Sequence, residues 1–258
     1  MTTYRCADAN DLREAWARAV AGDEVQLSPG DYPMGDGPDF VRAGVSTRGL
    51  GNAQNTLIRY TGQLSLTQSA NCCVHIAIAR GEPVRTTQFR DFTLSVAPGR
   101  MLCAPIGVAE GGYASANTQR VTFDRVRVRG VSDALYFDDL WAEVTLSDCE
   151  ISSNFDLMYC SGAVKITAVR TYFQCQLDYA RSGYLAPTSS QFSGVSRARL
   201  AACTWDVRQV DEVPVESWDH MGIYTSSTQD TVITDTKMIT NMPKLWSKFG
   251  DGRVLINQ

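Results

Sequence analysis

The stretch from Val121 to Phe173 decides the fold, because it contains one short strand phrase three times. The copies read VTFDRVRVRGVSDALYF (121–137), AEVTLSDCEISSNFDLMYC (142–160) and AVKITAVRTYF (163–173). Asp133 and Asp156 each stand where a polar run turns apolar, and they are 23 residues apart. A repeat of roughly 20 to 25 residues is typical of one coil of a solenoid, so the stretch predicts stacked coils.

The same phrase recurs outside this stretch as an apolar residue, two further residues, and then an apolar residue or Cys. The copies are Phe89-x-x-Phe92, Phe123-x-x-Val126, Leu146-x-x-Cys149, Ile166-x-x-Val169, Leu200-x-x-Cys203 and Ile233-x-x-Thr236. Their first members lie 34, 23, 20, 34 and 33 residues apart, which indicates coils with longer loops on one face. We expect the second positions to form one inward stack, with strands about 4.8 Å apart. The predicted stack is Phe92, Val126, Cys149, Val169, Cys203 and Thr236.

Residues 8–22 read as an amphipathic helix that covers the open end of the first coil. Its apolar face is Leu12, Ala15, Trp16 and Ala19, at the spacing of a 3.6-residue period. Asp11-x-x-Glu14 resembles a capping box, and Gly22 is the expected stop. Alternating strands are expected at 23–27 and 56–60, with a loop over 33–53.

These elements predict an all-β chain: a single-stranded, right-handed parallel β-helix (a pectin lyase-like solenoid) with an N-terminal capping helix. An amphipathic helix, Gly-Asp, an alternating strand and Pro-Gly form a familiar opening of such proteins. We expect one domain over 1–258, whose tail at 241–258 covers the far end through Leu245, Trp246 and Phe249. An antiparallel sandwich is the alternative, but its hairpin dipeptides are almost absent between these strands.

Composition narrows the possible partners and the compartment. The net charge of −4 and the pI of about 5.2 argue against nucleic acid as a partner. No apolar run approaches the roughly 18 residues of a membrane span, and no signal peptide is evident at the start. We therefore expect a cytoplasmic protein without a membrane partner, or a mature secreted form that begins at a new Met1.

The eight cysteines favour reduced, structural thiols, since several occupy interior strand positions. No CxxC or His-rich spacing suggests a metal, and no cofactor is expected. The run Arg120, Arg125, Arg127 and Arg129 alternates, which favours a solvated strand face over a site for an acidic polymer.

Asp133 and Asp156 fall at equivalent places on adjacent coils if one coil is 23 residues long. Two carboxyl groups one rung apart do not both ionise freely, so the pKa of one of them rises. Such a pair supplies a carboxylate and a carboxylic acid together, as acid–base and covalent catalysis require. The structural alternative is two aspartates in solvent loops, but the apolar residues that follow each of them favour a site.

The sequence around this pair resembles the pectin methylesterase family. That family carries Gln-Asp-Thr-Leu-Tyr and then Val-Asp-Phe-Ile-Phe-Gly, which correspond here to SDALY (132–136) and FDLMYC (155–160). The resemblance implies a right-handed parallel β-helix. It also implies that Asp156 is the nucleophile on a methyl ester and that Asp133 is the general acid and then the base.

Three family positions are replaced in this chain. Ser132 stands where the family has the Gln of the oxyanion site, and the upstream Gln position falls near Glu110. The Gly-Arg-Pro-Trp motif is missing; its counterpart VESW (215–218) keeps Trp218 but puts Glu216 in place of the Arg. The sequence therefore predicts a divergent member that lacks the family's Gln and Arg residues.

Two further groups of residues are candidates near the pair. His220 follows Glu216 and Trp218, and a His beside carboxylates acts as an acid or base near neutral pH. Trp218, Tyr136 and Tyr224 form a floor for a sugar or an apolar ligand, or else they pack in the core or in loops. His75 lies in an alternating strand and is expected to be structural.

Three hypotheses for the function remain open. The first is a carbohydrate ester hydrolase that resembles pectin methylesterase. The second is an intracellular isomerase, lyase or cyclase of a small molecule, which uses Asp133, Asp156, Glu216 and His220. The third is a non-catalytic carbohydrate-binding or phage tail-type β-helix. None requires a metal or cofactor, and the sequence leaves the oligomeric state open.

Overall fold

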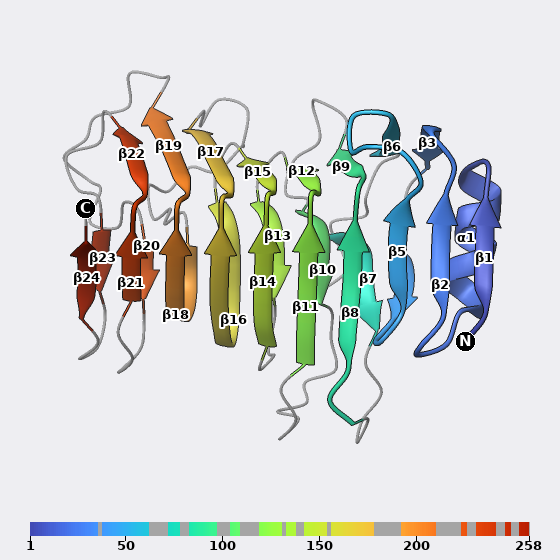
Figure 1. The fold of residues 1–258 in the computed structure, drawn as a ribbon, viewed down its shortest axis with the longest axis horizontal. Coiled ribbons are helices and arrows are strands. Elements are labelled where there is room, and N and C mark those ends of the chain that lie inside the picture. Colours follow the sequence, from blue (N-terminus) through green and yellow to red (C-terminus); the bar gives the residue numbers. More distant parts are fainter. Residues whose placement is uncertain are drawn as a thin grey trace.

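The chain is wound into a right-handed parallel β-helix whose long axis runs across Figure 1. This computed structural model describes residues 1–35, 38–61, 72–77, 83–96, 104–108, 119–130, 133–137, 142–153, 156–177, 192–209, 223–225, 231–240, 246–248 and 253–257. In these residues every ladder between strands is parallel, which excludes the antiparallel sandwich.

Each coil contributes strands to three faces, here called A, B and C. Faces A and C belong to one hydrogen-bonded sheet, because the long strands β16 (Asp156–Val169) and β18 (Phe192–Ala201) start in face C and end in face A. The other strands of face A are β1 (Thr3–Cys6), β2 (Glu24–Leu27), β5 (Ser46–Gly49), β8 (Thr86–Arg90), β11 (Gln119–Asp124), β14 (Ala142–Ser147), β21 (Thr231–Thr234) and β24 (Val254–Asn257).

Face B is the second sheet, and face C lies behind face A in Figure 1. Face B consists of β3 (Gly30–Met34), β6 (Thr56–Tyr60), β9 (Thr93–Val96), β12 (Arg127–Arg129), β15 (Glu150–Ser153), β17 (Tyr172–Leu177), β19 (Thr204–Gln209) and β22 (Lys237–Thr240). Face C consists of β4 (Asp39–Arg42), β7 (Cys72–Ala77), β10 (Ala104–Val108), β13 (Asp133–Phe137), β20 (Ile223–Thr225) and β23 (Trp246–Lys248), with the first parts of β16 and β18.

The predicted inward stack exists, with one error of register. Leu146 pairs with Ala168 rather than with Ile166, so the phrase on that coil is Ala168-x-x-Thr171. Val169 is only half-buried, whereas Thr171 is 1% exposed. The phrase was assigned to the wrong residues because β16 runs from face C into face A without a break. Its alternating apolar residues fit the phrase in two registers, two residues apart. The corrected stack is Phe92, Val126, Cys149, Thr171, Cys203 and Thr236.

The core is built from such columns, in which like side chains stack on successive rungs. Phe89 and Phe123 are register partners, and their rings stack with centroids 5.4 Å apart and an interplanar angle of 20°. On the face B side, the Phe173 and Trp205 rings are 5.2 Å apart. A fully buried aromatic side chain of this kind stabilises the fold by about 1.5–3 kcal/mol.

The corner between faces A and B holds a non-glycine residue in the left-handed conformation on six successive coils. This corner column is Asp91, Arg125, Asp148, Arg170, Ala202 and Asp235, with φ values of 61°, 53°, 54°, 48°, 51° and 47°. The conformation costs about 1–2 kcal/mol per residue. A ladder offsets the cost, because each N–H in the column donates to a backbone carbonyl of the next coil, as Arg125 does to Ser147 at 2.9 Å.

Helix α1 (Ala9–Arg18) covers the first coil at the N-terminal end, as predicted. Its buried face is the expected one, and the Trp16 indole donates to the Thr47 hydroxyl at 3.0 Å. The caps differ from the prediction. Asp8 is the N-cap, because its extended backbone lets its carboxylate accept from two N–H groups of the first turn. The helix ends at Arg18, and Gly22 (φ 93°) serves the turn that follows.

The expected loop over 33–53 was wrong, since this segment contains β4 and β5. Gly49 ends β5 under the backbone of the next coil, and a Cβ there would lie 2.1 Å from the Asp91 carbonyl oxygen. The sequence prediction missed these two strands, which complete the first coils, because the segment is rich in polar residues. In the tail, β23 and β24 add a further rung to faces C and A. Leu245 and Phe249 lie outside the described residues, and of Trp246 only the backbone is described.

Candidate functional site

Asp133 and Asp156 begin two adjacent parallel strands of face C. Asp133 is the first residue of β13 and Asp156 the first of β16, and the two are register partners. In-register neighbours on adjacent strands lie about 4.8 Å apart along the solenoid axis. The structure thus places the backbones of the two aspartates one rung apart, as the 23-residue spacing predicts; their catalytic roles stay a prediction.

The apolar residues after each aspartate explain why these strands are held in place. Leu135 and Met158 are register partners, and both are fully buried in the core. Leu157 and Ala134 are also fully buried, although they stand on the other side of their strands. The start of β13 and β16 is therefore fixed on both sides of the sheet, which suits a site that must hold two groups at a set distance.

An aromatic row crosses face C on the strands that carry the pair. Tyr136 is half-buried, and its register partners are Gly107 on β10 and Tyr159 on β16. The row continues toward the N-terminal end through His75 and the 54% exposed Phe40, whose rings lie 5.4 Å apart. Sequence reasoning missed Phe40, because the segments that separate it from the next rungs differ in length.

Tyr224 belongs to the same face but lies further toward the C-terminal end. It sits on β20, which pairs with β18, which in turn pairs with β16. The structure thus brings Tyr136 and Tyr224 to the sheet that carries the aspartates; of Tyr224 only the backbone is described. The other predicted site residues, Ser132, Glu110, Glu216, Trp218 and His220, lie outside the described residues.

A separate polar cleft of about 400 Å³ lies at the corner between faces A and B, away from the aspartates. Its lining includes Asn52 and Gln54 from the first coils, together with Arg127 and Glu150 from face B. Its charges are paired, as Arg127 Nε lies 3.1 Å from a Glu150 carboxylate oxygen. This cleft is therefore a neutral polar surface.

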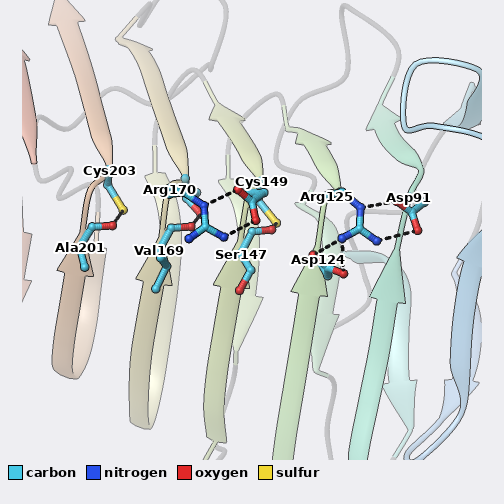
Figure 2. Close-up of polar contacts among 11 residues, drawn as sticks. Asp91, Asp124, Arg125, Ser147, Cys149, Val169, Arg170, Ala201 and Cys203 are labelled. Atoms are coloured by element: carbon cyan, nitrogen blue, oxygen red, sulfur yellow. Dashed lines mark hydrogen bonds and ion pairs between the residues drawn. The ribbon is translucent and has the colours of Figure 1, made fainter.

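The corner column beside this cleft carries two ion pairs, which Figure 2 shows. Arg125 Nε donates to Asp91 Oδ1 at 2.7 Å, and Arg170 Nε donates to Asp148 Oδ1 at 2.7 Å. The Arg170 guanidinium lowers the pKa of the Asp148 carboxyl. The prediction that the arginine run forms one strand face was wrong, because its members are spread over faces A and B and this corner. Each of them is paired with a carboxylate.

The described cysteines are structural, as expected. Cys6, Cys73, Cys149, Cys175 and Cys203 are buried and form no disulfide. Burial raises the pKa of the Cys149 thiol to about 11, which keeps it protonated and unreactive. Within the described ranges no group of His, Cys, Asp or Glu is arranged to hold a metal ion. In the same ranges no helix is long and apolar enough to span a membrane.

Solved structures of pectin methylesterases share this architecture. The enzyme from Yersinia enterocolitica matches with a TM-score of 0.62 and 16% identity, over 95% of this chain and 89% of that chain. The enzyme from carrot matches with a TM-score of 0.57 and 11% identity, over 98% and 87% of the two chains. A pectin methylesterase in complex with a hexasaccharide matches with a TM-score of 0.53 and 14% identity, over 88% and 75%.

At the level of sequence, no protein-family model matches the chain. No curated protein matches it either. At 11–16% identity the structural matches establish the fold and leave the chemistry open. The chain therefore has the right-handed parallel β-helix of pectin methylesterases, with a strongly diverged sequence.

Proposed function

We propose that this protein is a carbohydrate ester hydrolase that removes methyl groups from an esterified polyuronate. The observation that carries the proposal is the register pairing of Asp133 with Asp156 on adjacent strands of face C. The pectin methylesterase fold supports it, as does the hexasaccharide named for one of the similar structures. The half-buried Tyr136, three residues after Asp133 on β13, adds an aromatic surface on which a sugar ring packs.

In this mechanism the two carboxyl groups take different roles because they are close together. One group stays protonated beside its neighbour, which leaves one carboxylate and one acid. The Asp156 carboxylate attacks the ester carbonyl carbon, and Asp133 gives its proton to the departing methoxide, which leaves as methanol. Asp133 then takes a proton from water, and that water attacks the acyl group and releases the free uronate and Asp156.

The remaining candidates surround this pair in the proposal. Ser132 precedes Asp133 and donates to the oxyanion in place of the Gln of pectin methylesterases. Glu110 stands near the position of their second Gln. Glu216 and His220, from the segment before β20, adjust the protonation of the pair in place of an arginine. Trp218, together with Tyr136 and Tyr224, forms the floor on which the sugar chain lies.

Methanol release from methyl-esterified pectin tests this proposal directly. The purified wild-type chain is compared with Asp156→Asn, Asp133→Asn and the control Asp148→Asn, which changes an aspartate on a different side of the solenoid. We expect activity in the wild type and the control and none above background in the other two. An absence of methanol from every esterified pectin offered to the wild type contradicts the proposal.

A further inference from the structure

Face A carries a cluster of three cations that the arginine run of the sequence does not include. Lys165 on β16 and Arg197 on β18 are register partners, and Arg199 lies two residues after Arg197 on the same side of β18. Buried residues alternate with them, so the three side chains point outward. Their backbones lie about 5 to 8 Å from one another, given the strand spacing and the rise per residue. We call Lys165, Arg197 and Arg199 the cation cluster.

In the described part of the chain no carboxylate forms an ion pair with the cation cluster. Glu143 is the register neighbour of Lys165, but its carboxylate pairs with Arg120 on the other side, at 3.2 Å. The Nε of Arg197 is buried and has no hydrogen-bond partner among the described residues. Among the described residues the three cations therefore have no carboxylate partner, although the buried Nε of Arg197 is not itself open to a ligand.

This arrangement costs stability, since like charges directly opposite one another on adjacent strands repel. Lysines and arginines on edge strands protect a sheet from aggregation, but β16 and β18 are both paired on two sides and have no edge to protect. From β8 to β18, face A presents five cations and two carboxylates, although the whole chain has a net charge of −4. The cation cluster thus lowers the stability of the sheet and is opposite in sign to the net charge of the chain. Binding of an anionic ligand explains such a cluster.

We propose that the cation cluster binds the carboxylates of an acidic polysaccharide, a polyuronate chain that lies along face A. Guanidinium groups bind carboxylates through short, charge-assisted hydrogen bonds. The exposed Thr167, beside Arg199 in register, adds a neutral hydroxyl for the sugar hydroxyls. The choice of a polyuronate rests on the proposed function, because ester hydrolysis at Asp156 creates uronate carboxylates. β16 starts at Asp156 and carries Lys165 nine residues later, so one strand connects the two sites.

Calorimetric binding of de-esterified polygalacturonate tests this site, with Asp156→Asn as the background so that turnover plays no part. We expect Arg197→Gln/Arg199→Gln to weaken binding by at least about tenfold, because two charge-assisted contacts are lost. Arg120→Gln is the control: it removes one positive charge from face A, against two in the double variant, and its guanidinium is already paired. The control is expected to change affinity by less than about twofold. Salt is expected to weaken the binding of polygalacturonate, because it screens the charges. Fully esterified pectin, which has no carboxylates, is expected to bind weakly and with an affinity that does not depend on salt.

Equal affinities of the double variant and the Arg120→Gln control would overturn the site. Duplex DNA that binds as tightly as polygalacturonate would overturn the choice of a carbohydrate. The double variant is expected to melt at or above the wild-type temperature, and a lower melting temperature would make the cluster structural. Methanol release by the wild type is measured separately. If the protein binds polyuronate but releases no methanol, the proposed hydrolase is refuted and the binding site stands. If it releases methanol but the double variant binds polyuronate as tightly as its background, only the binding site is refuted.

Discussion

The corner column and the start of face C use the same stacking geometry with opposite charge patterns. In the corner column the signs alternate through Asp91, Arg125, Asp148 and Arg170, and two ion pairs result. At the start of face C, the register partners Asp133 and Asp156 are residues of the same charge. A β-helix converts each repeat position into a ladder with rungs about 4.8 Å apart, so every charge meets the residue one coil away. Alternating signs stabilise such a ladder, and like charges directly opposite one another destabilise it.

The largest expected effect concerns the like-charged aspartates. Asp156→Asn removes the proposed nucleophile and is expected to lower methanol release from esterified pectin by at least about 10³-fold. Asp148→Asn removes a carboxylate from the alternating column and is expected to retain the rate to within about twofold, because it touches only the fold. Initial rates at saturating substrate measure both. Equal losses in the two variants would remove the distinction between the two regions.

A charge reversal in the corner column is expected to have the next largest effect. Arg125 forms ion pairs with Asp91 and Asp124. Arg125→Glu removes both pairs and places a third anion beside these two aspartates. We expect the free energy of unfolding to fall by about 1–2 kcal/mol, a range set by the half-exposed position of the arginine. Urea unfolding measures the change. Arg125→Gln, which removes the charge without reversing it, is expected to lose less than half as much.

The backbone of the corner column offers a smaller test. Ala202 holds φ at 51° without any charged group, so Ala202→Gly removes left-handed strain and is expected to stabilise the fold by up to about 1 kcal/mol. Ala201→Gly is the matched control one residue earlier, at the end of β18, where glycine is expected to cost about 0.5–1 kcal/mol. Both are measured by urea unfolding. Destabilisation of similar size in the two variants would show that the corner stores no strain.

The smallest effect is the pH dependence of the pair between Arg170 and Asp148. The guanidinium lowers the pKa of Asp148 in the folded state, so its contribution is present above the unfolded pKa and is lost as the pH falls through the folded pKa. Because both side chains are substantially exposed, Arg170→Gln is expected to lower the free energy of unfolding only slightly at pH 7. The difference from the wild type is expected to shrink as the pH falls through the lowered pKa of Asp148, and to vanish once that carboxyl is protonated. If Arg170→Gln remains less stable than the wild type in acid, the lost stability comes from packing of the arginine side chain and not from the ion pair.

The sequence was informative where the repeat is local. The strand phrases, the buried face of the capping helix and the adjacency of Asp133 and Asp156 follow from hydrophobic period and spacing. The register error at Ile166 arose because β16 is one continuous strand of 14 residues, in which no turn residue marks the frame. The left-handed corner was missed because Asp and Arg stand there instead of glycine. The cation cluster was missed because Lys165 and Arg197 meet only through the register of two distant strands.

Thermal unfolding of Asp156→Asn at pH 7, beside Arg125→Glu, tests most directly whether repeated charge marks function and alternating charge marks stability. The account predicts that Asp156→Asn melts at or above the wild-type temperature, because the repulsion with Asp133 is relieved while methanol release is lost. Arg125→Glu is predicted to melt below the wild type. A melting temperature of Asp156→Asn as low as that of Arg125→Glu would contradict the account, because the aspartate would then hold the fold together as the corner arginine does.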